Sequence, residues 1–385
     1  MTVDLQALTP DVLRARRTLK WASQPDDVLA MWVAEMDYPT APAITAALHR
    51  AVDAETFGYP LDAGPSGLAD ALADDLASRH GWTVDPDDVF LVADVMRGVT
   101  LALETFSGRD DPVVITTPVY MPFFDVVELS GRPQVHVPMV DVEGCPTFDL
   151  VALDAALTQG ARTVLLCNPY NPLGRVLDRA ELLALAEVVE RHGARVIADE
   201  IHAPLVFEGI HLPYASLTPA TAGHTVTLVS ASKAWNLPGL KCAQVVTSNA
   251  ADRAAWRRIP LWAKVGVASL GIEASVAAYR EGQEWLADVR TLLARHAELV
   301  AEAVDGMPGV RHRRNEGTYL AWLDCTELEL DADPAEWFLQ EAKVALSPGR
   351  PFRAPAHRFA RLNFATTTTI LVESLGRMHQ AVEKR

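Results

Sequence analysis

A lysine that follows two serines, Lys233, stands in a stretch whose residue types could do covalent chemistry, SASKAWNLPGLK at 230–241. The stretch comes after an apolar run at 225–229 that predicts a buried parallel strand. Ligands of open α/β sheets bind at the carboxyl ends of the strands, where this lysine is expected. Its amine could hold an aldehyde cofactor as a Schiff base, with Ser230 and Lys241 on the cofactor's phosphate. Taken alone, the pattern fits a solvated surface lysine better.

An acidic turn follows a second predicted strand at 195–199. Its sequence is DEIH, and Asp199 stands at the end of the strand. A carboxylate there can keep a pyridine nitrogen protonated, which makes the ring an electron sink, as in pyridoxal phosphate catalysis. The alternatives are a helix cap for Asp199 and a satisfied core position for His202. A metal site formed by these residues with Glu200 and His211 is not expected, because the sequence has no helical pair of histidines.

Three further candidates lie near the ends of other predicted strands. Asn171, in the turn NPYNPLG at 168–174, could donate to the phenolate oxygen of a pyridoxal ring. The turn at 94–97 joins a strand to a helix, and its free amides can receive a phosphate. Tyr120 could stack on a flat ring. The alternative for Asn171 is an ordinary proline-rich turn, and the alternative for Tyr120 is an ordinary core position. The turn at 94–97 is a weak signal by itself.

From residue 89 onward, short apolar runs alternate with helical segments. The runs are continuously apolar, which indicates a mostly parallel sheet covered by helices on both faces. The sequence therefore predicts an α/β fold built on a seven-stranded sheet. The strands are expected at 90–93, 112–118, 134–140, 163–167, 195–199, 225–229 and 242–248.

Two domains of unequal size are expected from the length and from a change of pattern near Gly306. A long helix is predicted at 270–304 before that point. Beyond it, short strands and helices indicate a smaller α+β domain, with elements at 318–324, 335–344, 361–365 and 370–383. The predicted division is an N-terminal arm at 1–47 that joins the small domain, a large cofactor-binding domain at 48–285 and a small C-terminal domain at 286–385.

The overall charge of the chain limits its partners. Of 385 residues, 34 are Lys or Arg and 50 are Asp or Glu, which gives a formal charge of −16. Such a chain is poorly suited to bind nucleic acid or an anionic membrane. No apolar run reaches the roughly 20 residues that span a bilayer, and the N-terminus lacks a signal-peptide pattern. The four cysteines are far apart, so we expect reduced thiols in a cytoplasmic protein.

Seven short motifs, taken in their order and spacing, are similar to those of one family. The chain resembles the fold-type I pyridoxal-phosphate enzymes of the class I/II aminotransferase superfamily. Within it, the chain is most similar to the MalY/PatB-type cystathionine β-lyases, also called cysteine-S-conjugate β-lyases. The resemblance covers the whole length and implies the aspartate aminotransferase-like fold. The motifs are WVAEMDY at 32–38, FGYP at 57–60, PVY at 118–120, CNPYNP at 167–172, DEIH at 199–202, SASK at 230–233 and EGTYLAWLD at 316–324.

The resemblance implies pyridoxal 5′-phosphate as cofactor and a role for each residue around its ring. Lys233 is the Schiff-base lysine and general base, and Asp199 partners the ring nitrogen. Asn171 contacts the ring oxygen and the substrate. Tyr120 stacks on the ring and is expected, with Lys233 and Asp199, to take part in catalysis. His202 also binds the cofactor, at a position where aminotransferases usually carry tyrosine, which favours a lyase.

The phosphate is implied to lie against a separate group of side chains and amides, namely Ser230, Ser232, Lys241 and the amides of Val95 and Met96. This part departs from the family pattern. Relatives usually have glycine where Asp94 stands, and many have arginine in place of Lys241. A carboxylate beside a phosphate is unfavourable unless it caps the helix or pairs with Arg97.

Two further residues complete the implied site. Arg361 would clamp the α-carboxylate of the substrate with its planar guanidinium. Tyr59 is expected to reach the phosphate and substrate of the neighbouring subunit, so the active unit is expected to be a homodimer.

The implied reaction is an α,β-elimination on an amino-acid substrate. The amine of Lys233, freed by the substrate, takes the Cα proton. A thiolate then leaves from Cβ, which its thiol pKa of about 8.5 favours, and the remainder yields pyruvate and ammonia. We therefore expect cystathionine or another S-substituted L-cysteine as substrate. The alternatives are an aminotransferase on the same scaffold and a MalY-like regulator that binds a partner protein.

Overall fold

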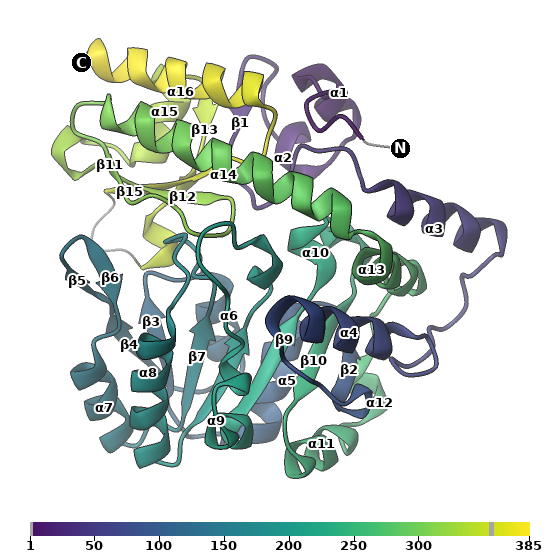
Figure 1. Cartoon of the computed structure of the whole chain (residues 1–385). Coiled ribbons are helices and arrows are strands. Elements are labelled where there is room, and N and C mark those ends of the chain that lie inside the picture. Colours follow the sequence, from purple (N-terminus) through teal and green to yellow (C-terminus); the bar gives the residue numbers. More distant parts are fainter. Residues whose placement is uncertain (1–2, 354–357) are drawn as a thin grey trace.

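The central sheet of the computed structural model is built from the predicted strands (Figure 1). The structure describes residues 3–353 and 358–385. The strands are β2 (Val89–Val92), β3 (Val113–Thr117), β4 (Gln134–Pro138), β7 (Thr163–Cys167), β8 (Arg195–Asp199), β9 (Thr225–Val229) and β10 (Ala243–Thr247). Within the described residues these seven form one sheet in the order β2-β10-β9-β8-β7-β3-β4. All neighbours are parallel except β10, which is antiparallel to β2 and β9. The predicted fold class is confirmed.

Helices lie on both sides of this sheet (Figure 1). Strands β3, β7, β9 and β10 are buried at every position, because both of their faces are covered and their apolar side chains leave water. A capping box of Asp178 and Glu181, a spacing that can be read from the sequence, starts α8 (Arg179–Arg191). The other helices of this lobe are α3 (Pro42–Asp53), α4 (Leu68–His80), α5 (Val95–Phe106), α6 (Pro122–Leu129), α7 (Leu150–Thr158), α9 (Pro219–His224), α10 (Ala231–Ala234), α11 (Ala250–Arg257), α12 (Leu261–Lys264) and α13 (Ser269–Glu281).

The smaller lobe contains a second, four-stranded sheet in which each strand pair is antiparallel. Its strands are β11 (Arg311–His312), β12 (Leu320–Asp324), β15 (Phe359–Asn363) and β14 (Ser347–Pro348), in that order. The helices are α14 (Gln283–Asp305), α15 (Pro334–Glu341) and α16 (Thr368–Glu383). The helix expected at 335–344 ends at Glu341, because Val344 pairs with the N-terminal arm.

The prediction of one long helix at 270–304 is wrong in one respect. The segment forms two helices, α13 and α14, that meet at Gly282. The indole of Trp235 donates a hydrogen bond to the Gly282 carbonyl at 3.0 Å. A Cβ at position 282 would lie 2.5 Å from that indole nitrogen. The apolar pattern continues across the break, so periodicity alone does not reveal it.

The N-terminal arm is joined to the small lobe by strand pairing. Its strand β1 (Leu29–Ala30), which follows α1 (Pro10–Ala15) and α2 (Leu19–Ala22), is parallel to β13 (Val344–Ala345). The buried carboxylate of Asp37 accepts hydrogen bonds at 2.7 Å from both Lys20 and Trp21, which holds the segment after β1 against α2. Residues 47 and 285 lie inside α3 and α14, and the predicted division into domains remains a prediction.

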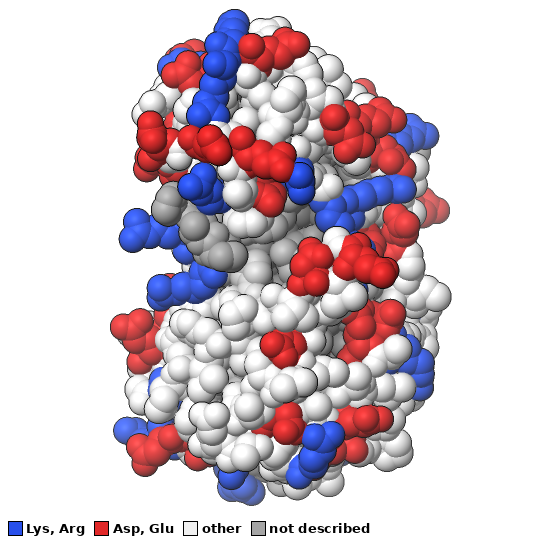
Figure 2. All heavy atoms as spheres, turned by 90° about the vertical axis from the view of Figure 1, so that its left-hand side faces the viewer, with Lys and Arg blue, Asp and Glu red and all other residues white. Residues whose placement is uncertain are grey.

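Acidic side chains are spread over both lobes on the face shown in Figure 2, in a chain with a formal charge of −16. Among the described residues, no helix combines the length and the apolar character needed to cross a bilayer. The same residues contain no group of three His, Cys, Asp or Glu side chains arranged to hold a metal ion.

Candidate active site

Three neighbouring parallel strands bring the predicted residues to one edge of the large sheet. Asp199, at the end of β8, is opposite Cys167 of β7 and Leu228 of β9. The turn with Asn171 follows β7, and the helix α10 with Lys233 follows β9. Because parallel strands end at the same edge, residues far apart in the chain meet here.

The amine of Lys233 faces the N-terminal arm. Its Nζ donates a hydrogen bond to the carbonyl oxygen of Ala34 at 2.9 Å. Burial, followed by the positive charge of Arg361, lowers the pKa of this amine from 10.5 to about 8, against the raising effects of Asp199 and Glu35. A lysine with this pKa is a base and nucleophile near neutral pH, which an exposed lysine is not.

Asp199 is a buried carboxylate at the floor of the site. Its Oδ1 accepts a hydrogen bond from the Ile201 amide at 3.1 Å. Burial nevertheless raises its pKa from 3.8 to about 7, against the lowering effects of that hydrogen bond and of Lys233. A cationic N–H donor placed on this carboxylate would favour its ionised form.

Arg361 is a buried guanidinium between the two lobes. Its Nη1 donates to Asn171 Oδ1 at 3.1 Å, and its Nη2 donates to the Trp32 carbonyl at 3.1 Å and Ser347 Oγ at 3.2 Å. Burial lowers its pKa from 12.5 to about 10. Among the described residues, no carboxylate forms an ion pair with it. A buried cation bonded only to neutral groups suits a ligand's carboxylate.

Of the two aromatic candidates beside these charges, His202 is buried and Tyr120 is partly buried. Burial, followed by the negative charge of Asp199, raises the pKa of Tyr120 to about 12, so the phenol is neutral. The ring of His202 lies edge-on to Tyr319 with centroids 5.9 Å apart. Burial lowers the pKa of His202 to about 3, and its Nδ1 has no hydrogen-bond partner. The imidazole is therefore neutral and keeps an orphaned polar atom inside the site.

The side chains expected to hold the phosphate form two separate sets of contacts, at the starts of α10 and α5. Ser230 caps α10, and its Oγ lies 2.7 Å from Ser232 Oγ. Asp94 caps α5, accepting from the Arg97 amide at 2.8 Å, while its second oxygen accepts from Lys241 Nζ at 2.9 Å. Of the two arrangements expected for Asp94, the helix cap is therefore present. The guanidinium of Arg97 instead bonds the Ala263 carbonyl.

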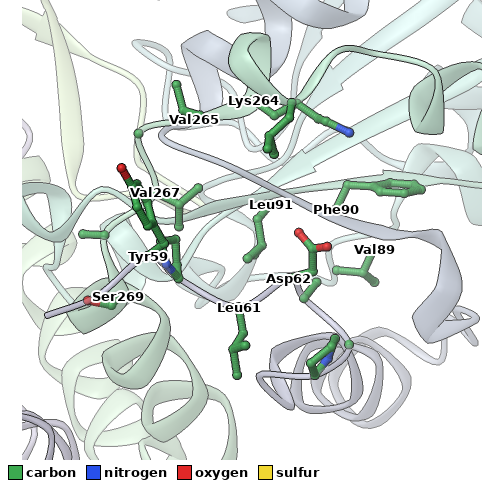
Figure 3. A pocket seen from close by; sticks show the side chains of 18 of the residues that line it. Tyr59, Leu61, Asp62, Val89, Phe90, Leu91, Lys264, Val265, Val267 and Ser269 are labelled. Atoms are coloured by element: carbon green, nitrogen blue, oxygen red, sulfur yellow. The ribbon is translucent and has the colours of Figure 1, made fainter. Parts of the chain in front are cut away.

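Tyr59 lies apart from this constellation within one chain. It is 100% exposed and lines a surface groove of about 1280 Å³ that extends to Leu240, next to Lys241. Figure 3 shows its ring in this groove with Leu91, Val265 and Val267. The structure brings the other predicted residues together in one chain and leaves Tyr59 on the surface.

Several contacts at the site were not predicted from the sequence. The carbonyls of Trp32 and Ala34 bind Arg361 and Lys233, and the Tyr319 hydroxyl donates to Ala34 as well. Ser347 bonds both Arg361 and the arm. The motifs at 32–38 and 316–324 marked these segments, but backbone carbonyls carry no residue-type signal.

Comparison with known proteins places the chain in a family. The model of the family "Aminotransferase class I and II" matches residues 26–376. The chain belongs to this family. It is 38% identical over 366 residues to the cystathionine beta-lyase of Corynebacterium glutamicum, covering 95% of this chain and 97% of that one. It is 33% identical to the cystathionine beta-lyase PatB of Bacillus subtilis, over 92% and 93% of the two chains.

A solved structure of the family has the same fold. It is that of a candidate PLP-dependent beta-cystathionase from Corynebacterium diphtheriae, which is 37% identical and superimposes with a TM-score of 0.94 over 99% of each chain. The predicted resemblance to the class I/II aminotransferase family and to its PatB-type members is confirmed.

The shifted pKa of Lys233 gives a testable prediction for the protein freed of small molecules. An amine reacts with trace acetic anhydride only when neutral, so labelling of Lys233 is expected to rise through pH 8, about two units below an ordinary lysine. Asp199→Asn removes a charge that raises this pKa, so the midpoint moves to lower pH. Asp178→Asn, at the cap of α8, is the control. A wild-type midpoint near pH 10 would contradict the prediction.

Proposed function

We propose that this protein is a pyridoxal 5′-phosphate-dependent carbon–sulfur lyase that cleaves cystathionine or another S-substituted L-cysteine. The observation that carries the proposal is one site with a low-pKa lysine, a buried carboxylate and a buried arginine that lacks an anionic partner. The names of the relatives from Corynebacterium and Bacillus support the same reaction.

The donor set fits the cofactor at each of its functional groups. Lys233 would bind the aldehyde, and the carboxylate of Asp199 would accept from the protonated ring nitrogen. Arg361 already uses the Asn171 oxygen, so the amide NH₂ of Asn171 remains to donate to the ring oxygen. Tyr120 and His202 would contact the ring. The phosphate would lie on Ser230, Ser232, Lys241 and the first amides of α5, Val95 and Met96.

The protein side chains then divide the work of elimination. Arg361 orients the substrate by its α-carboxylate, which replaces a neutral partner of the guanidinium with an anionic one. The neutral amine of Lys233 takes the Cα proton, and Asp199 in its ionised form holds the ring nitrogen protonated. When bound, the cofactor supplies an electron sink for the resulting carbanion. A thiolate is a good leaving group from Cβ, because a thiol has a pKa of about 8.5.

We predict that the protein supplied with pyridoxal phosphate releases thiol and pyruvate in equal amounts from L-cystathionine or S-methyl-L-cysteine, and that this needs no added 2-oxo acid. Lys233→Ala should lower this rate by roughly a thousandfold or more, whereas the exposed Lys384→Ala should match wild type. Turnover that depends on a 2-oxo acid would indicate an aminotransferase instead. If the wild type has no turnover, and binding of a partner protein survives in Lys233→Ala, the protein would be a regulator.

We also propose that Asp94 weakens cofactor binding although it caps α5, because the cap uses one carboxylate oxygen and leaves the negative charge in place. Its carboxylate lies at the start of α5 and shares Lys241, so it is next to any phosphate bound there. A phosphate carries −1.5 to −2 charges at pH 7, and the two anions repel each other. The ion pair with Lys241 offsets this repulsion only in part, because one cation then serves both anions.

The prediction for Asp94→Asn is tighter cofactor binding, because asparagine keeps the helix cap and removes the charge. We expect the Kd for pyridoxal phosphate to fall roughly fivefold, measured by absorbance titration of stripped protein. Asp178→Asn, which makes the same change at the cap of α8, serves as control and should leave the Kd unchanged. A higher Kd in Asp94→Asn would show that Asp94 assists binding.

We propose further that the active unit is a homodimer formed over the groove that holds Tyr59 (Figure 3). The groove is bordered by large exposed apolar side chains, namely Phe57, Tyr59, Leu61, Leu261, Trp262 and Val265. A continuous apolar surface of this kind indicates a protein interface. Because the groove extends to Leu240, beside Lys241, a tyrosine from a second copy would lie close to the phosphate site.

The dimer proposal predicts that Trp262→Asp converts a dimer to a monomer and weakens cofactor binding, as measured by analytical ultracentrifugation and absorbance titration. Val151→Asp is a matched control, since both side chains are 81% exposed and Val151 lies on α7, outside the groove. Tyr59→Phe should weaken cofactor binding, while the protein remains a dimer in the ultracentrifuge. A monomeric wild type, or a dimeric Trp262→Asp variant, would refute this interface.

We infer a reducing compartment, the cytoplasm, as the place of action. The four cysteines are unpaired, and Cys167, Cys242 and Cys325 are buried. Burial raises the pKa of Cys242 to about 11, so its thiol is uncharged and unreactive. These properties suit structural thiols in a cytoplasmic protein.

A further inference from the structure

The segment 32–37 of the N-terminal arm, called the strap below, crosses the site. It contacts one cationic side chain of each lobe, Lys233 of the large lobe and Arg361 of the small lobe. The carbonyl of Ala34 accepts bonds from Lys233 Nζ at 2.9 Å and from the Tyr319 hydroxyl at 3.1 Å. Two residues earlier, the carbonyl of Trp32 accepts from Arg361 at 3.1 Å. The position of the strap therefore sets the position of the lysine amine.

Two asparagines hold the strap in place. From the small lobe, Asn363 Nδ2 donates to the carbonyls of Val33 at 2.6 Å and Glu35 at 2.7 Å. From the large lobe, Asn236 Nδ2 donates to the Met36 carbonyl, and Asn236 Oδ1 accepts from the Met36 amide, both at 2.9 Å. The second contact is a closed pair of hydrogen bonds on a single residue of the strap.

Asn236 also lies in the same turn as the lysine, three residues after it. Its backbone has φ +57°, in the left-handed region that asparagine tolerates better than most residues. Lys233 and Asn236 thus hold the strap from one short segment at two nearby points, Ala34 and Met36. Both the donor and the acceptor of the carboxamide are used, and an ionised aspartate, which also tolerates this backbone, would lose the donor.

We propose that Asn236 is a positioning residue for Lys233. It fixes Met36 and, through the strap, the Ala34 carbonyl that holds the lysine amine in line for the Cα proton. This inference rests on the proposed function, in which Lys233 is the base. Proton transfer depends steeply on distance and orientation, and a displacement of about 1 Å can cost roughly a hundredfold in rate.

Two variants separate the side-chain bonds from the backbone. Asn236→Gly keeps the left-handed conformation and removes both bonds, whereas Asn236→Asp keeps the acceptor for Met36 and loses the donor. The control is Glu143→Gly, at φ +55° in the exposed turn between β5 (Val140–Val142) and β6 (Cys145–Thr147). It makes the same glycine replacement outside the site.

The experiment uses the holoenzyme and L-alanine, which has no thiolate to lose, so that exchange of its Cα hydrogen in D₂O reports the base alone. The primary isotope effect with Cα-deuterated alanine is measured beside it. Hydrogen–deuterium exchange of the 31–38 peptide reports the strap, and the visible absorption reports the bound cofactor.

We expect Asn236→Gly to speed amide exchange of the strap, to lower Cα exchange at least tenfold, and to raise the isotope effect, with Asn236→Asp intermediate and the cofactor retained. Cα exchange within twofold of wild type in both variants would overturn the proposal, whether or not the strap loosens. A lower rate with an unchanged isotope effect would also overturn it, since that is the mark of a smaller active fraction. If wild type itself neither binds cofactor nor exchanges alanine, the proposed function fails instead.

Discussion

The site depends on charged side chains that the fold removes from water without giving each an oppositely charged partner. Asp199 and Arg361 are buried and Lys233 is partly buried, and their pKa values move toward neutrality because the charged forms are disfavoured away from water. A core optimised for stability would pair or replace such groups. Here the neighbours of Arg361 are an amide, a hydroxyl and a carbonyl, all neutral. The fold keeps these groups in place through the large sheet and the arm, and under the proposed function a bound ligand would supply the missing opposite charges.

The site is assembled from segments that lie far apart in the chain. Strand β8 of the large sheet supplies Asp199, helix α10 after β9 supplies Lys233, and β15 of the small lobe supplies Arg361. Backbone carbonyls of the strap contact both of the cations. The arm is itself tied to the small lobe by the β1–β13 pairing and to its own core by the buried Lys20–Asp37 pair. The geometry of the reacting groups is therefore a property of the whole chain and of no single lobe.

Much of this arrangement could be predicted from the sequence, because continuous apolar runs fix parallel strands and place Asp199 and Lys233 at strand ends. The capping box of α8 was predictable for the same reason, since caps depend on local residue types. Contacts made by the peptide backbone were not predictable, and Ala34 is the clearest case. The break at Gly282 was also missed, because its cause is an indole from 47 positions earlier in the chain. The pairing of Asp94 with Lys241 joins residues 147 positions apart.

The break at Gly282 also connects the two lobes to the reactive lysine. Gly282 is where the chain passes from α13 of the large lobe to α14 of the small lobe, and its carbonyl accepts a hydrogen bond from Trp235, two residues from Lys233. The junction of the lobes is therefore bonded to the short segment that carries the nucleophile. A side chain at position 282 would press on the indole beside that lysine, because its Cβ would lie 2.5 Å from the indole nitrogen.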